Sequence, residues 1–483
     1  MKAAALREWI RGLPGRHGRT TLLILGAIVV LALVVRVARA HDPIEVPGPD
    51  SDAYSALASN LYKTGDYGTP GMENESDWSP GAVLFYTGVY VATGGVREEA
   101  ARYAVALIGA ALVLVVYALA RRLARAVSAG RRRRAGVAGP DQTGPGDREQ
   151  TAADEPDQTP PVASENVAGL TAALAVAVYP AFVYDAGRLM SEPFAELTLA
   201  GFVLSFLWAA EPGRSPWSYL LPGSLLGMTA LFRPEYLPFA LLFAGLAAFW
   251  AWRRSERRGP GLAIPAAALL AGFALLVAPW TIRNAIELDR LVPVSTGGGK
   301  ALFIGTYLPG DGDHYGTKRA LFYESHPGSD LPPDEVNLLP MTPFLDAVAA
   351  QRPELDRDAA LGAEGRENLE HLISEQPLDL AAMMGRKIWR MWRSGSGPGM
   401  DGVAPEVLHA ALCLLGLGGL VLLAARRRPE ALVFGLLVLG ITAIGAVLLA
   451  STRRNLILMP LVIALAGVAV AALLAGRGRA STV

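Results

Sequence analysis

Two aspartates one residue apart, Asp50 and Asp52, are the first residues of the chain whose type and spacing suggest chemistry. They lie in the stretch PGPDSDAYSALASNLYKTGDYG, residues 47–68. One such carboxylate could take a proton from a hydroxyl group as a general base, and two together could hold a cation. A structural role is also open, since Ser51 or Asp52 could cap a helix running from about 53 to 63.

Five basic residues form a second set that fits chemistry at phosphate. A reaction that breaks a bond to phosphate is helped by positive charge on the departing group. The planar fork of arginine grips phosphate oxygens, whereas lysine acts as a point charge. Contact with lipid headgroups is the alternative use of such side chains. The candidates are Arg233, Arg283, Lys300, Arg453 and Arg454, with Arg283 and Arg453 ranked first.

A third acidic candidate, Glu192, follows Asp185 and Arg188 at the junction between two apolar segments. An ionisable group within or next to membrane-spanning segments is energetically costly unless it faces a cavity or an oppositely charged partner. Glu192 could therefore belong to a site, or it could form an ion pair with Arg188 at helical spacing. Asp185 is predicted to lie at the surface.

The elements that must position these groups are those of a membrane protein. Of the 483 residues, 52% are hydrophobic and 18% are charged, and the mean hydropathy is +0.32. A spanning helix needs about 20 mostly apolar residues, and about ten segments near that length predict a mainly α-helical polytopic fold. These segments lie near residues 20–38, 100–120, 167–184, 193–210, 217–232, 236–252, 262–280, 405–425, 430–450 and 455–475.

The distribution of lysine and arginine predicts the orientation of these helices. Arginine clusters at the N-terminus, after the second segment and near the C-terminus fall on one side if ten helices are counted, and short basic loops favour the cytoplasm. Residues 40–99 and 281–402 then face outward in the plasma membrane. The acidic and basic candidates all lie on this outer side, where phosphate binding would explain the unusual basic residues.

These assignments divide the chain into five parts. The region after the second segment has a basic cluster followed by Gly, Pro, Gln, Thr and acidic residues, which predicts a disordered linker. The pattern of residues 377–394 predicts an amphipathic helix at the membrane interface. The parts are 1–125 with the first helices and the acidic outer loop, 126–166 as the cytoplasmic linker, 167–280 as a transmembrane core, 281–402 as an extracytoplasmic domain, and 403–483 as the C-terminal helices.

Other patterns argue against several further functions. The formal net charge is zero, so a nucleic-acid partner is not indicated. The stretch GGGK at 297–300 lacks the Walker spacing, no His or Cys cluster has zinc spacing, and no cofactor is indicated. Asp311, Asp313 and His314 could form a cation site, although a Gly-rich turn is the preferred interpretation.

Five stretches, taken in order, resemble the multispanning GT-C glycosyltransferases that use polyprenyl-phosphate sugars. The resemblance is to the bacterial branch related to protein mannosyltransferases and to the aminoarabinose transferase of lipid A. It depends on the order of the stretches and on their placement on one side of the membrane. They are DSDAYSALASNLYKTGDYG in the first outer loop, YDAGRLMSEPFAEL at 184–197, FRPEYLPF at 232–239, PWTIRNAIELDRLVPVSTGGGKALFIGTY at 279–307 and STRRNLILMPLVIALAG at 451–467.

The resemblance implies an enzyme that moves a hexosyl or pentosyl group from a polyprenyl-phosphate carrier to a hydroxyl acceptor, with inversion and without a metal ion. In the family the catalytic acid lies in this first loop, shortly before a tyrosine such as Tyr54. Asp50, four residues ahead of Tyr54, is therefore the first choice for the base and Asp52 the second. Glu192 matches a second acidic position, which could orient the acceptor or hold the first aspartate through an intermediary.

The expected partners are the lipid-linked donor, membrane lipids and an acceptor that could be a protein, a lipid or a glycan. Two alternatives stay open, namely a transporter or flippase of lipid-linked sugar, and a polysaccharide polymerase or ligase. A transporter would place its site near the membrane midplane. The enzyme hypothesis predicts instead that Asp50, Glu192 and Arg283 converge on one outer cavity.

Overall fold

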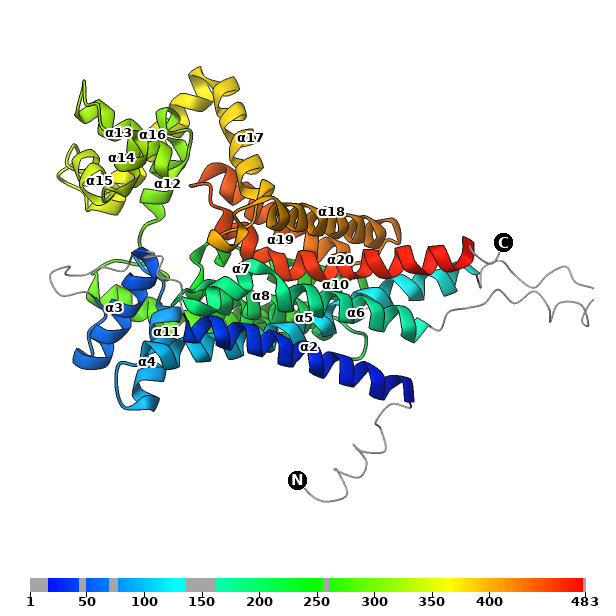
Figure 1. Cartoon of the computed structure of the whole chain (residues 1–483). Coiled ribbons are helices and arrows are strands. Elements are labelled where there is room, and N and C mark those ends of the chain that lie inside the picture. Colours follow the sequence, from blue (N-terminus) through cyan, green and yellow to red (C-terminus); the bar gives the residue numbers. More distant parts are fainter. Residues whose placement is uncertain (1–15, 43–48, 69–76, 136–160, 255–259, 481–483) are drawn as a thin grey trace, which may run out of the picture.

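All regular secondary structure in the described part of the chain is helical. The computed structural model describes residues 16–42, 49–68, 77–135, 161–254 and 260–480 (Figure 1). The α-helices are α2 (Arg16–His41), α3 (Pro49–Thr64), α4 (Pro80–Thr93), α5 (Glu98–Ala135), α6 (Pro161–Val178), α7 (Pro180–Tyr184), α8 (Glu192–Ala209), α9 (Leu220–Phe232), α10 (Phe239–Arg254), α11 (Ile264–Glu287), α12 (Gly298–Thr306), α13 (His314–Ser325), α14 (Pro333–Leu338), α15 (Thr342–Ala349), α16 (Arg357–Glu375), α17 (Pro377–Arg393), α18 (Val403–Ala425), α19 (Glu430–Val447) and α20 (Thr452–Ala480). Short 3-10 turns are η1 (Asp185–Gly187), η2 (Pro216–Tyr219), η3 (Pro234–Tyr236), η4 (Pro260–Ala263), η5 (Leu308–Gly310) and η6 (Pro398–Met400).

Each of the predicted spanning segments is helical, and the polytopic, mainly α-helical fold is confirmed. Among the described residues, eight helices are long and apolar enough to cross a membrane, and the number is nine if α6 and α7, which are bent by 51° to each other, are counted as one span. The bend falls at Pro180, where a proline interrupts the helix. The remaining predicted span corresponds to α9, which has 13 residues and follows the turn η2. At 1.5 Å per residue this helix is about 20 Å long, shorter than the hydrocarbon core.

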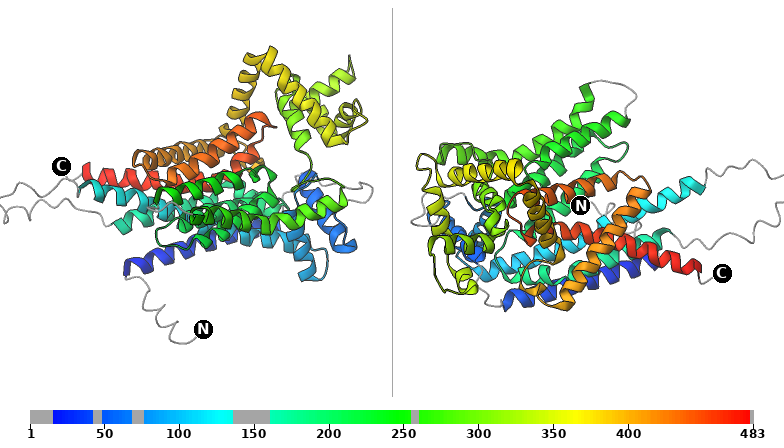
Figure 2. Two further views of the ribbon diagram at one scale, coloured as in Figure 1. Left: turned by 180° about the vertical axis from the view of Figure 1, so that it is seen from behind. Right: turned by 90° about the horizontal axis from the view of Figure 1, so that it is seen from above.

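The bundle is packed through small residues and presents leucines outward. Helices α2, α5, α6, α8 and α20 lie along one another in the views of Figure 2. Gly223 of α9 lies so close to α11 that an added Cβ would overlap the carbonyl oxygen of Leu269. Such glycines let membrane helices approach closely. On the outside, leucines 70% to 75% exposed suit contact with lipid tails, namely Leu23, Leu241, Leu275, Leu414 and Leu439.

Helix α3 carries the aspartate pair and starts earlier than predicted. It begins at Pro49, so Asp50 and Asp52 lie in its first turn. Proline in the first turn and acidic residues next to it both favour a helix start. The expected helix from 53 with Ser51 or Asp52 as its cap was therefore wrong at its start. Ser51 Oγ accepts a hydrogen bond from the backbone N–H of Leu189 at 3.0 Å instead.

Helices α12 to α16 form a small unit beyond one end of the bundle, and α17 runs back from it toward the bundle (Figure 1). The unit is joined to the end of α19, because the backbone N–H of Leu449 donates to the carbonyl oxygen of Ala301 at 2.9 Å. Lys387 Nζ of α17 donates to the carbonyl oxygens of Gly305 at 2.8 Å and Val447 at 3.1 Å. These bonds hold α12 over the bundle end. The unit has its own core of Phe303, Ile304, Leu321, Met341, Leu345 and Leu361.

Two predicted boundaries differ from the structure. Helix α5 continues to Ala135 and α6 begins at Pro161, so both ends of the predicted linker, 126–166, are helical. Its middle, 136–160, lies outside the described residues. Helix α11 runs to Glu287, beyond the predicted boundary at 281. Arginine and alanine favour helices, which explains the extension of α5 past its apolar part.

Candidate active site

Four helix ends meet at the bundle end that lies under α12. Glu192 is the first residue of α8, and Arg453 is the second residue of α20. Ser451 caps α20, since its Oγ accepts a hydrogen bond from the backbone N–H of Arg453 at 3.2 Å. Arg233 follows α9 in an extended conformation, with φ −144° and ψ 98°, because the next residue is proline. With Asp50 in the first turn of α3, these ends bring four of the candidates together.

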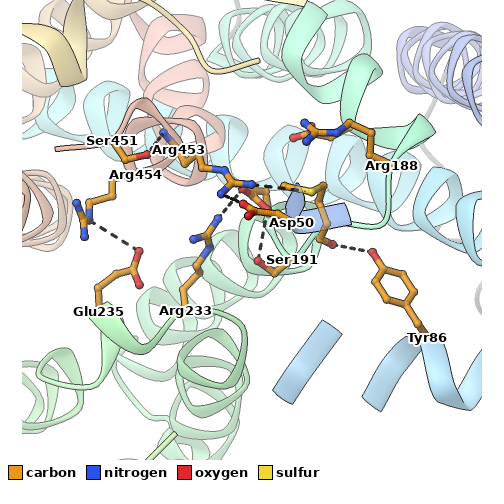
Figure 3. A network of polar contacts seen from close by, with 12 residues as sticks. Asp50, Tyr86, Arg188, Ser191, Arg233, Glu235, Ser451, Arg453 and Arg454 are labelled. Atoms are coloured by element: carbon orange, nitrogen blue, oxygen red, sulfur yellow. Dashed lines mark hydrogen bonds and ion pairs between the residues drawn. The ribbon is translucent and has the colours of Figure 1, made fainter. Parts of the chain in front are cut away.

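The four charged side chains form one network (Figure 3). Arg453 Nε lies 2.8 Å from Glu192 Oε1, and its Nη1 donates to Asp50 Oδ2. Arg233 Nη2 lies 2.6 Å from the same Glu192 oxygen. Glu192 is 1% exposed, and a buried carboxylate of this kind depends on its cationic partners. Arg453 therefore joins Asp50 to Glu192.

The expected pair of Glu192 with Arg188 does not form. Arg188 Nη1 instead lies 3.7 Å from Asp185 Oδ1. Arg188 is extended, with φ −130° and ψ 152°, and α8 begins only at Glu192, so helical spacing does not apply to these two residues. The predicted surface position of Asp185 was also wrong, because this residue is 5% exposed.

A cavity of about 600 Å³ opens beside the network and collects most of the predicted residues. Asp50 and Lys300 both line it. The Lys300 side chain forms no ion pair within the described residues. Arg454 Nε lies 4.0 Å from Glu235 Oε1, a longer separation than those within the network. The charged and aromatic candidates on its wall are Asp50, Tyr54, Arg233, Lys300, Arg453 and Arg454, and its apolar wall consists of Leu237, Pro238, Ile444, Leu448 and Leu449.

Tyr54 supports the wall of the cavity from α3. Its ring meets that of Trp78 edge to face, with 5.0 Å between centroids. Burial raises the pKa of the Tyr54 phenol above its ordinary value, so the hydroxyl stays protonated. Tyr54 is therefore a neutral group beside Asp50 and does not compete with it as an anion.

Asp52 and Arg283 are the two candidates that the structure separates from the others. Asp52 is exposed on α3 and forms no ion pair with another described residue. Arg283 lies on α11, with its guanidinium 5.5 Å from the ring centre of Tyr67 and 5.2 Å from that of Trp280. Neither residue lines the cavity. Asp50 and Glu192 are brought together through Arg453, but Glu192 does not line the cavity, and Arg283 belongs neither to the network nor to the cavity.

Several lining residues were not selected from the sequence. Asp77 Oδ1 accepts a hydrogen bond from Thr296 Oγ1 at the edge of the cavity, and Glu235 faces Arg454. Glu235 stands inside the FRPEYLPF stretch, two residues after Arg233, and could have been chosen there. Asp77 precedes Trp78 in the same predicted outer loop as Asp50, which is a weaker signal.

The carboxylates of the site do not fit a metal centre. The Arg453 guanidinium contacts both Asp50 and Glu192, so it occupies the position that a shared cation would take. Across the described ranges, no three His, Cys, Asp or Glu residues are grouped so that they could hold a metal ion. At the other candidate cation site, Asp313 Oδ2 accepts from the backbone N–H of Gly316 at 2.9 Å, and Asp311 pairs with Arg386 at 2.7 Å. Asp313 thus caps α13 and Asp311 pairs with α17, and the backbone between them forms the predicted turn, in which the N–H of Asp311 donates to the carbonyl oxygen of Leu308 at 2.9 Å.

The helical arrangement described above is similar to the fold of solved oligosaccharyltransferase structures, which are GT-C glycosyltransferases, the class that the sequence resembles. AglB oligosaccharyltransferase from Archaeoglobus fulgidus, in complex with an inhibitory peptide and a dolichol-phosphate, aligns with a TM-score of 0.51 at 11% identity, over 95% of this chain and 51% of that chain. An Archaeoglobus fulgidus oligosaccharyltransferase in the apo form aligns with a TM-score of 0.50 at 14% identity, over 94% of this chain and 50% of that chain.

ArnT from Cupriavidus metallidurans, bound to undecaprenyl phosphate, aligns with a TM-score of 0.36 at 16% identity, over 92% of this chain and 77% of that chain. The chain spans about half the length of the oligosaccharyltransferase chains that it matches. No protein-family model and no curated protein sequence matches it.

Proposed function

We propose that the protein is a membrane glycosyltransferase that moves a sugar from a polyprenyl-phosphate carrier to a hydroxyl acceptor on the outer side of the plasma membrane. The observation that carries this proposal is the composition of one cavity. A carboxylate, Asp50, shares it with the cationic groups of Lys300 and Arg454 and with an apolar wall. A base, a phosphate site and a surface for a lipid chain are the three features that such a transfer requires.

The donor fits the cavity by its chemistry. Lys300 and Arg454 are less engaged with acidic partners than Arg233 and Arg453, so they are the first candidates to hold the carrier phosphate. The apolar wall between η3 and the end of α19 would accept the start of the polyprenyl chain. The complex of the structurally similar AglB with dolichol-phosphate supports a donor of this class.

Asp50 is proposed as the general base of a single displacement. Arg453 contacts its Oδ2, and Oδ1 has no hydrogen-bond partner among the described residues, so Oδ1 can accept the proton of the acceptor hydroxyl. The acceptor oxygen then forms its bond to the sugar anomeric carbon while the bond from that carbon to the phosphate oxygen breaks. The leaving phosphate takes the electron pair and is stabilised by the adjacent cations. This route inverts the anomeric configuration.

Glu192 is proposed to position the two arginines that frame Asp50. It is buried and contacts both Arg233 and Arg453, which makes it a positioning residue, not a second base. The intermediary between Glu192 and the first aspartate is then Arg453.

The location of the cavity favours an enzyme over a transporter or flippase. Its charged residues come from the first turns of α3, α12 and α20 and from the segments before α4 and after α9, whereas a transporter site is expected near the middle of the spanning helices. A polysaccharide polymerase or ligase would use similar groups, and the size of the transferred unit would distinguish it from a single-sugar transferase.

The test is a donor turnover assay that does not depend on knowing the acceptor. The purified full chain in lipid nanodiscs is supplied with a labelled polyprenyl-phosphate sugar and with cell-envelope extract, and free polyprenyl phosphate and labelled product are followed by chromatography. We expect both to appear together, at a rate that depends on the extract. A protein that only relocates the donor across the membrane without cleaving it would refute the proposal.

A further inference from the structure

A second cavity, of about 570 Å³, lies at the other end of α8, between α5, α8 and α9. Its apolar wall includes Leu204 and Trp208 of α8 and Leu221 of α9. Trp208 is about 24 Å along the helix from Glu192, at 1.5 Å per residue. Leu221 is half exposed, so the groove opens at the side of the helix bundle, which faces lipid in a membrane protein. By the distribution of arginines, this is the predicted cytoplasmic end.

Three arginines of α5, Arg121, Arg122 and Arg125, line the groove beside this apolar wall. Glu165 lies 3.9 Å from Arg121 and 3.0 Å from Arg125. Glu211 lies 2.5 Å from Arg122 and 3.3 Å from Arg214. Two carboxylates thus face four guanidinium groups, which leaves a surplus of positive charge beside an apolar groove.

Two hydrogen-bond donors at the groove have no acceptor in the described part of the protein. The Nε atoms of Arg121 and Arg122 are buried and make no hydrogen bond. Buried Nε atoms of several other arginines, such as that of Arg36, also lack an acceptor, so the surplus of positive charge and not these two atoms indicates a bound anion. Phosphate oxygens are the acceptors that best match arginine.

We propose that this groove binds one anionic phospholipid of the cytoplasmic leaflet. The phosphate would accept hydrogen bonds from Arg121 and Arg122, with Arg125 adding charge, and an acyl chain would lie along Leu204, Trp208 and Leu221. Two of the three helices around the groove, α5 and α8, are long and apolar enough to span a membrane, which leaves lipid as the neighbouring molecule, and the charge surplus selects an anionic headgroup. This site is separate from the cavity that Asp50, Lys300 and Arg454 line, called the outer cavity below. It does not depend on the function proposed for the outer cavity.

The test measures lipid retention by native mass spectrometry on the full chain, released from nanodiscs of phosphatidylglycerol or phosphatidylcholine. Gly201→Leu fills the apolar part of the groove, and its Cβ would make an ordinary contact, 3.5 Å from Leu225 Cδ1. Arg125→Gln removes charge from a side chain that is 63% exposed, and its folded fraction is checked by size-exclusion chromatography because Arg125 pairs with the buried Glu165. Arg253→Gln is the matched control, because Arg253 is exposed at the same end of the bundle and does not line the groove.

We expect the unaltered protein to retain phosphatidylglycerol about tenfold more than phosphatidylcholine. Gly201→Leu should lose the bound lipid, Arg125→Gln should lower retention about threefold, and Arg253→Gln should not change it. Equal retention of the two lipids would overturn the proposal. Unchanged retention in both groove variants would also overturn it, and would assign the bound lipid to general contact with the bundle surface.

Discussion

The two ends of α8 place arginines next to cavities of similar volume but opposite chemical character. The outer cavity has acidic residues on its wall, Asp50, Asp77 and Glu235, among its basic ones. The groove at the other end has arginines and apolar side chains but no acidic residue among its described lining. Within the described lining, a candidate base is therefore present in the outer cavity and absent from the groove. Under the two proposals, arginine binds phosphate at both ends of α8, and a carboxylate on the wall distinguishes the site proposed for reaction from the one proposed for binding.

The largest effect is expected when the Asp50 carboxylate is removed from the outer cavity, because this carboxylate distinguishes the two cavities. Asp50→Asn should lower donor turnover by about 10²- to 10⁴-fold, because the amide cannot accept the proton of the hydroxyl acceptor. Asp52→Asn is the matched control, since Asp52 is exposed and lies outside the cavity, and we expect a much smaller effect. Turnover is measured per folded protein after size-exclusion chromatography. Comparable losses in both variants would mean that the site depends on the charge of α3 and not on a base at residue 50.

The second prediction contrasts the acidic residues that hold arginines at the two ends. Glu192→Ala should lower the free energy of unfolding by about 3–5 kcal/mol, because it removes the buried carboxylate that the partly exposed Arg233 and Arg453 share. Glu211→Ala should cost only about 0–1 kcal/mol, because this side chain is 36% exposed. Thermal unfolding in a fixed detergent compares the two. Equal destabilisation would contradict the buried network at the outer end.

The third prediction compares donor binding after substitution of Arg454, which lines the outer cavity, and of Arg283, which does not. Arg454→Gln should raise the donor KM about tenfold, since a hydrogen bond to a charged group is lost, and Arg454→Lys should recover part of that loss. Arg283→Gln should change the KM less, although the sequence ranked Arg283 higher, because its guanidinium lies over Tyr67 and Trp280. Steady-state kinetics with a varied donor decides between them. A larger effect at Arg283 would place the phosphate nearer to α11.

The smallest expected effect is that of metal removal. Because Arg453 lies between the two carboxylates, we expect chelation with EDTA to leave turnover unchanged, with residual metal checked by elemental mass spectrometry. Loss of activity that manganese or magnesium restores would make Asp50 a metal ligand and would shift the search for the base to other carboxylates.

The sequence predicted the helical segments well because an apolar run of about 20 residues is a local property. It also selected most of the charged residues that line the outer cavity, because they follow or precede those runs. The sequence could not predict which side chains pair within the site, since Arg453 and Asp50 are 403 positions apart. Helical spacing suggested Arg188 as the partner of Glu192, but the extended backbone before α8 removes that relation. Likewise, nothing local to Arg283 reveals that Tyr67, from a distant loop, lies beside it.

The most direct measurement is a cryo-electron microscopy structure of the Asp50→Asn variant with a polyprenyl-phosphate sugar. The account predicts that the phosphate lies within hydrogen-bond distance of Arg454 or Lys300. It also predicts that the sugar anomeric carbon is close to residue 50 and that the chain lies along Leu237 and Leu448. A donor bound between the middles of the spanning helices, or with its phosphate away from these cations and its sugar away from residue 50, would contradict it.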